Sequence, residues 1–118
     1  MSTRSAGHAG QAGRGHLHSM ALVRTTVGSR DAADALARQL VNQGLAACCH
    51  VGEVRSTYKW KGTLVEEPEW LVEARALESR VVAVRDAMLA DHPYELPLVE
   101  VVTATGIPKA YWDWARAG

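Results

Sequence analysis

Two adjacent cysteines and a histidine, Cys48, Cys49 and His50, form the densest group of metal-ligating residue types in the sequence. A thiolate and an imidazole together suit Cu(I) or Zn(II). In a strand, side chains two positions apart share a face, so Cys48 and His50 can act together while Cys49 points away. Two ligands leave a metal site incomplete, and free cysteine often packs in protein interiors, so we favour packing over ligation here.

A second candidate metal site surrounds His92, with Asp91 and Glu95 as its nearest acidic neighbours. Carboxylates are hard donors and imidazole is borderline, so this set would accept Cu(II), Zn(II) or Ni(II) with little discrimination. The alternative is that His92 donates a hydrogen bond to a backbone carbonyl and fixes the turn before Pro93. The sequence supports both interpretations.

The aromatic residues are unusual in kind, with four Trp, three Tyr and no Phe. Rings with a polar group suit interfaces and the rims of pockets. If these rings and one arginine line a cleft between subunits, that cleft would bind an anion or a small planar ligand. The stronger interpretation is that they anchor a subunit interface. The candidates are Tyr58, Trp60, Arg75, Tyr94 and Trp114.

Charge and motifs exclude several classes of protein. Thirteen basic and thirteen acidic side chains give a formal net charge of zero, whereas a nucleic-acid-binding protein normally carries a basic excess. The chain has no Gly-x-Ser-x-Gly, Walker or dinucleotide-binding glycine motif, so we expect no enzymatic activity. It has no apolar run long enough to span a bilayer. We therefore expect a cytoplasmic protein without nucleic-acid or membrane partners.

Hydrophobic periodicity and residues that interrupt helices and strands predict the elements that position these candidates. Residues 21–27 are β-rich, and Ser29 is a good N-cap for a helix over residues 30–43. A short buried strand at 45–50, a strand at 56–61, a turn at 61–63 and a strand at 70–77 follow. Ser79 is expected to cap a second helix that ends before Pro93. A strand at 98–105 and a short C-terminal helix complete the chain.

This order predicts one α+β domain over residues 20–118 with a ferredoxin-like β-α-β-β-α-β arrangement and a C-terminal helical turn. Met1–Ser19 has almost no large apolar residues and is expected to be a disordered tail or an expression leader. Both helices would cover one face of the sheet. The bare opposite face and a long two-stranded ribbon would then need to be buried, most simply by a second copy of the chain.

Several motifs resemble the CutA divalent-cation-tolerance family, over residues 21–115. The motifs are Leu45-Ala46-Ala47-Cys48, Ser56-x-Tyr58-x-Trp60-x-Gly62, Glu66-Glu67, His92-Pro93-Tyr94-Glu95-x-Pro97 and Tyr111-x-Asp113-Trp114. The second and fourth together, at this separation, are specific. The chain differs from the family at Cys49-His50, where Val-Asn is common, at Arg75-Ala76, where Lys and Thr are usual, and at Leu98, where an acid is expected.

The resemblance implies a ferredoxin-like subunit in a homotrimer whose ribbons pair between subunits, and a loose kinship to PII-type signalling proteins. It also implies a role in tolerance of copper and other divalent metal ions, without a catalytic reaction. We therefore expect a trimer that binds copper or another divalent cation and possesses a signalling-type function. The alternatives are a trimeric docking protein with an unknown protein partner, or a PII-like sensor of a small ligand with incidental metal binding.

Overall fold

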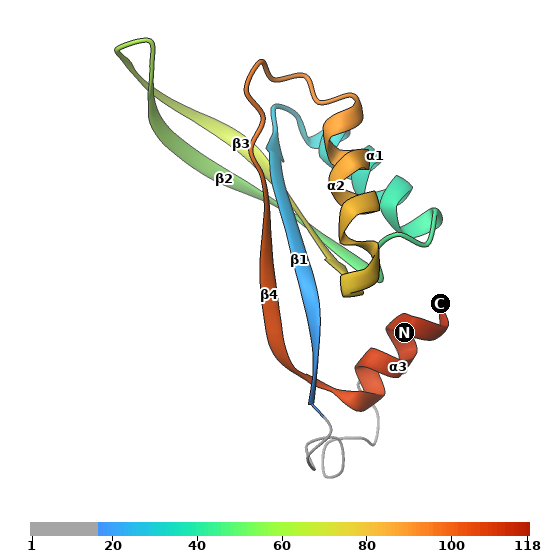
Figure 1. Ribbon diagram of the computed structural model, residues 1–118. Coiled ribbons are helices and arrows are strands. Elements are labelled where there is room, and N and C mark those ends of the chain that lie inside the picture. The colour runs from blue at the N-terminus through green and yellow to red at the C-terminus, as the bar shows by residue number, and fades with distance from the viewer. Residues whose placement is uncertain (1–16) are drawn as a thin grey trace.

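The computed structural model describes residues 17–118, so most of the predicted tail lies outside the described residues. The elements follow in the order β1 (Leu17–Val27), α1 (Arg30–Asn42), β2 (Cys48–Trp60), β3 (Thr63–Ala76), the 3₁₀ turn η2 (Glu78–Arg80), α2 (Val81–Ala90), β4 (Val99–Pro108) and α3 (Lys109–Ala117). The strands form one antiparallel sheet in the order β2-β3-β1-β4 (Figure 1). The predicted α+β class and element order are confirmed, and β1 begins before the predicted boundary at Met20.

Helices α1 and α2 begin differently. The Ser29 side chain accepts a hydrogen bond from the backbone N–H of Ala32 at 3.1 Å, so the predicted cap of α1 is confirmed. The predicted cap of α2 at Ser79 is wrong. Ser79 lies inside η2, and α2 starts after Arg80 without a side-chain cap. A 3₁₀ turn satisfies some free amide groups by itself, which explains why this helix needs no capping hydroxyl.

The hairpin of β2 and β3 is longer than the sequence suggested. The strands predicted at 45–50 and 56–61 are one continuous strand that begins at Cys48, and β3 begins at Thr63 rather than near Trp70. The predicted turn is confirmed. Lys61 (φ 51°) and Gly62 (φ 83°) form a two-residue turn with both φ angles positive, which is the geometry that matches the twist of a hairpin.

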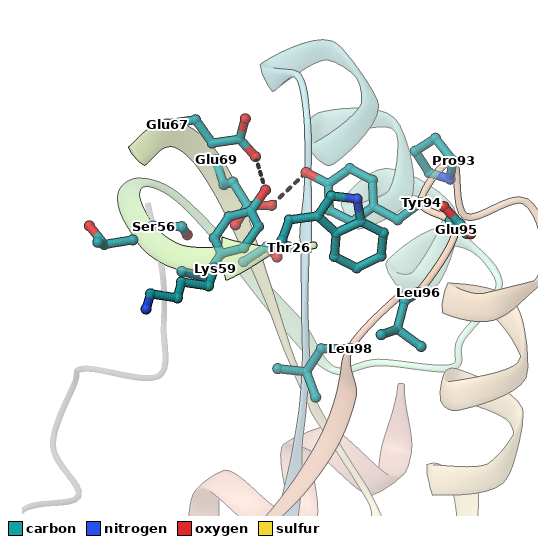
Figure 2. Close-up of a pocket in the computed structure, with 13 residues that line it drawn as sticks. Thr26, Ser56, Lys59, Glu67, Glu69, Pro93, Tyr94, Glu95, Leu96 and Leu98 are labelled. Atoms are coloured by element: carbon teal, nitrogen blue, oxygen red, sulfur yellow. Dashed lines mark hydrogen bonds between the residues drawn. The ribbon is translucent and has the colours of Figure 1, made fainter. Parts of the chain in front are cut away.

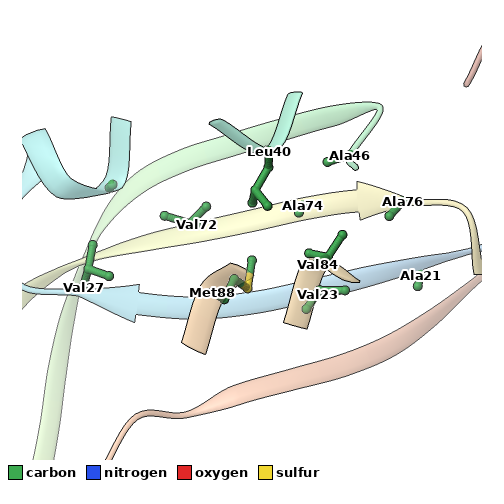
Figure 3. Close-up of a cluster of buried hydrophobic side chains, with 11 residues drawn as sticks. Ala21, Val23, Val27, Leu40, Ala46, Val72, Ala74, Ala76, Val84 and Met88 are labelled. Atoms are coloured by element: carbon green, nitrogen blue, oxygen red, sulfur yellow. The ribbon is translucent and has the colours of Figure 1, made fainter. Parts of the chain in front are cut away.

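The core lies between the sheet and the two helices α1 and α2, which Figure 1 shows on one side of it. Alternate strand residues point into it, as strand geometry requires. The largest buried side chains here are Val23, Leu40, Val72, Val84 and Met88, each at most 2% exposed (Figure 3). These apolar contacts hold β1 and β3 in place and so fix the root of the hairpin.

The face of the sheet away from α1 and α2 is not wholly apolar, because charged side chains lie on it, and α3 packs at one end of the sheet. At one end, α3 packs against β1 and β4, and Trp112 stacks on His18 with ring centroids 4.4 Å apart. Further along, the Arg24 guanidinium lies 3.7 Å from the carboxylates of both Glu73 and Glu100.

None of the helices found in residues 17–118 combines the length and the apolar character needed to cross a bilayer.

Candidate functional site

A groove of about 850 Å³ lies where the hairpin leaves the sheet, beside the segment that joins α2 to β4 (Figure 2). Residues of β2, β3 and the 93–98 segment form its walls. Its lining combines aromatic rings, hydroxyl groups and carboxylates, among them Ser56, Tyr58, Trp60, Glu67, Glu69 and Tyr94. A hollow of this size is within the range of small-molecule sites.

Two tyrosine–glutamate pairs organise the groove (Figure 2). The Tyr58 hydroxyl donates to Glu67 Oε1 at 2.7 Å across the hairpin, and the Tyr94 hydroxyl donates to Glu69 Oε2 at 2.5 Å. The hydrogen bond to Glu67 is the main cause that raises the pKa of Tyr58. Burial, followed by the hydrogen bond to Glu69, raises the pKa of Tyr94. Both phenols therefore stay protonated and keep donating to carboxylates.

Glu69 is the most deeply placed acid of the groove, at 7% exposed. Burial is the largest single influence on its pKa and raises it. Hydrogen bonds from Ser56, Tyr94 and Thr26 act in the opposite direction, together with the attraction of His92, and the net effect lowers the pKa of Glu69. The site thus holds an ionised carboxylate surrounded by hydroxyl donors.

His92 acts as an anchor of the 92–98 segment. Its Nδ1 accepts the backbone N–H of Tyr94 at 3.2 Å. Its Nε2 lies 3.1 Å from the carbonyl oxygen of Thr26 and 3.0 Å from the Thr25 hydroxyl, which itself donates to the carbonyl of Leu98. An amide can only donate and a carbonyl can only accept, so Nδ1 is the acceptor and Nε2 carries the proton. Both nitrogens are engaged, as the turn-fixing interpretation requires.

Cys48 and His50 share a face of β2, as predicted, and Cys48 Sγ lies 3.9 Å from His50 Nε2. His50 Nδ1 lies 4.0 Å from Glu73 Oε1. Both cysteines are free. Cys49 packs against the helix-side core, and burial, with a smaller contribution from Cys48, raises its pKa from 9.0 to about 11. Its thiolate, the metal-binding form, is therefore disfavoured.

The structure separates the other predicted site residues. The groove brings together Tyr58, Trp60 and Tyr94, with exposed Glu95 on its wall. Arg75 lies six positions beyond Glu69 on β3, roughly 20 Å away. Trp114 lies on α3 with its ring centroid 5.3 Å from that of Tyr111. These two do not share one cleft with the three rings within a single chain.

The predicted His92, Asp91 and Glu95 set does not form a cluster. Residues 17–118 contain no group of three or more His, Cys, Asp or Glu that could hold a metal ion. Ser56, Glu67 and Glu69 are groove residues that sequence reasoning did not assign to a site. The available signal was the position of Glu69 between Pro68 and Trp70, where alternation in β3 turns an acid inward.

Comparison with known proteins agrees with this architecture. A family model described as CutA1 divalent ion tolerance protein matches residues 21–118. The divalent-cation tolerance protein CutA of Thermotoga maritima is 30% identical over 97 residues, which are 82% of this chain and 96% of that protein. The structure of CutA from Synechococcus elongatus superimposes with a TM-score of 0.81 at 31% identity, covering 86% of this chain and 94% of that one. CutA1 from Oryza sativa gives a TM-score of 0.77 at 28% identity, covering 84% and 91%. The chain therefore belongs to the CutA1 divalent ion tolerance family.

Proposed function

We propose that this protein acts in divalent-cation tolerance as a homotrimer that binds copper or another divalent metal ion, without catalysing a reaction. One observation is the main support for the proposed assembly. Pairing of β3 with β1 starts at Trp70, so within residues 17–118 the segment from Thr63 to Glu69 pairs with β2 alone, and no further strand lies on either edge of this ribbon. A long ribbon with free edges is a template for pairing with other copies.

Side chains along the hairpin support the same proposal. Leu64 is 60% exposed and Trp60 is 38% exposed. Covering these exposed apolar side chains with a second copy removes their surface from water and so stabilises the assembly.

Sedimentation equilibrium of the full chain tests the assembly. The wild-type protein is expected to have the mass of a trimer, and Leu64→Glu is expected to dissociate it because a charge enters a dry contact on the hairpin face away from the groove. The matched control is Val82→Glu, since Val82 is 65% exposed on α2, away from the hairpin. A trimeric Leu64→Glu protein would show that this side chain lies outside the interface, and a monomeric wild type would refute the assembly.

Cys48 and His50 are the pair best placed to bind a soft or borderline ion. Donors of one tetrahedral zinc site are separated by about 3.5 Å, and the observed Sγ to Nε2 distance is 3.9 Å. The described part of the chain supplies two donors here and no third one, so the site is completed by solvent or by a neighbouring copy. His92 is unsuited to this role because both ring nitrogens are engaged.

Calorimetric titration with Zn(II) and Cu(II), with Mg(II) as the hard-ion control, tests the metal site. The N-terminal segment contains two further histidines, and imidazole groups can bind these ions, so every sample carries His8→Ala and His16→Ala. We expect Zn(II) binding to weaken at least tenfold in Cys48→Ser and in His50→Ala, and to persist in His92→Ala. Binding that survives both β2 substitutions would exclude this pair.

A second candidate function is that of a small-ligand sensor. It is favoured by the groove, whose volume and mixed lining match small-molecule sites. We also propose a cytoplasmic location, since a reducing compartment suits the free thiols of Cys48 and Cys49. Cell fractionation tests this location.

A further inference from the structure

We propose that the groove at the base of the hairpin binds a small organic ammonium ion. This inference rests on the small-ligand candidate function and is independent of the metal site. The carboxylates of Glu67 and Glu69 supply the charge, and the rings of the groove supply the contact surface. Glu69 is buried, so its charge is screened less by solvent than that of a surface acid.

The balance of charge in the groove selects a cation. Its lining contains the three carboxylates of Glu67, Glu69 and Glu95 and one ammonium group, that of Lys59. Figure 2 shows the end of the Lys59 side chain directed away from Glu67 and Glu69. The sequence suggests an anion or a small planar ligand because it groups Arg75 with the rings, but Arg75 lies elsewhere on β3 and the described residues that line the groove include no arginine.

The aromatic rings select an organic cation rather than a bare metal ion. A divalent metal ion needs several oxygen ligands at about 2.0–2.6 Å, and one oxygen each of Glu67 and Glu69 already accepts a tyrosine hydroxyl. An alkylammonium ion has diffuse charge, requires no fixed ligand geometry and is attracted to the faces of Trp and Tyr rings. Tyr58, Trp60 and Tyr94 line the same groove as the carboxylates.

One contact of this kind already exists at the edge of the groove. The Lys61 ammonium lies 5.7 Å from the centroid of the Trp60 ring. The ring is therefore accessible to a cation at this distance, and Lys61 competes with an incoming ligand for it. Removing the Lys61 charge should tighten ligand binding, which is a result that general destabilisation cannot produce.

Calorimetric titration of the full chain with choline chloride tests the proposal. The neutral isostere 3,3-dimethylbutan-1-ol is the matched ligand control. We expect saturable binding of choline and at least tenfold weaker binding of the alcohol. Glu67→Gln and Trp60→Leu should each weaken choline binding about tenfold, and Lys61→Asn, which tolerates the left-handed turn, should strengthen it about threefold. Glu78→Gln removes the same charge outside the groove and should change nothing.

Equal affinity for choline and the alcohol would overturn the proposal, as would an unchanged affinity in Glu67→Gln. Absence of choline binding to the wild-type protein would also overturn it, whether the groove is empty or filled by a neighbouring copy. Sedimentation and Zn(II) titration of the same samples report separately on the trimer and the metal site. A failure of the ammonium proposal is therefore distinguishable from a failure of the proposed function.

Discussion

Replacing His92 with alanine separates a structural histidine from a metal ligand. The substitution removes the hydrogen bond from the Tyr94 amide at 3.2 Å and the donation from Nε2 toward Thr26 O and the Thr25 hydroxyl. Each lost hydrogen bond of this kind is worth about 0.5–1.5 kcal/mol, and of the groups left behind Thr25 is buried while Thr26 and Tyr94 are half-buried. We expect the free energy of unfolding to fall by about 2 kcal/mol in the absence of metal.

Urea denaturation followed by circular dichroism measures this change, at one fixed protein concentration because assembly makes stability concentration-dependent. His92→Asn is a graded variant, since its side-chain oxygen can still accept the Tyr94 amide, and it should recover about half of the loss. His50→Ala is the control. His50 is exposed on β2, and its loss should change the free energy of unfolding by less than about 0.5 kcal/mol.

A metal ligand without a structural role would behave in the opposite way. His92→Ala would then unfold at the wild-type urea concentration and lose its affinity for Zn(II). Either result would refute the assignment of His92 as the anchor of the 92–98 segment.

Three further predictions test the core, the turn and the buried acid. Leu40→Ala should lower the free energy of unfolding by about 2–5 kcal/mol in urea denaturation, because Leu40 is fully buried, and a loss below about 1 kcal/mol would contradict its place in the core. Gly62→Ala should lower it by about 1 kcal/mol because φ is 83° there, and an unchanged midpoint would argue against this turn geometry. The pKa of Glu69 is lowered on folding, so its contribution is complete above its ordinary value of 4.5 and is lost as the pH falls through the folded value. Between pH 5 and pH 3, Glu69→Gln should therefore lose less stability than the wild type, and equal losses would refute this role.

Local sequence signals predicted the elements whose causes are local. The Ser29 cap and the Lys61-Gly62 turn depend on neighbouring residues, and both are found where predicted. The break expected between the strands at 45–50 and 56–61 is absent because Gly52 pairs with Leu71 in the middle of a regular ladder. Cross-strand pairing thus outweighs the weak strand preference of one glycine.

The chemistry of the site could not be predicted because its contacts are distant in sequence. The choice between two roles of His92 depends on Thr25 and Thr26, which precede it by 67 and 66 residues. The hydrogen-bond donors to the Glu69 carboxylate are the side chains of Tyr94, Ser56 and Thr26, which lie on three separate segments of the chain. A pattern within one strand identifies an inward acid but not the hydroxyl groups that surround it.

The register of the hairpin links its fold to the groove. The ladder pairs Ser56 with Glu67 and Val54 with Glu69, which places both acids on the side that Tyr58 occupies. A slip of one residue would move both acids to the opposite face, since side chains alternate along a strand. The two-residue turn at Lys61 and Gly62 sets this register, and the Thr57 hydroxyl donates to Glu66 Oε2 at 3.4 Å on the reverse side. The turn therefore determines which carboxylates face the groove, although it contributes no carboxylate itself.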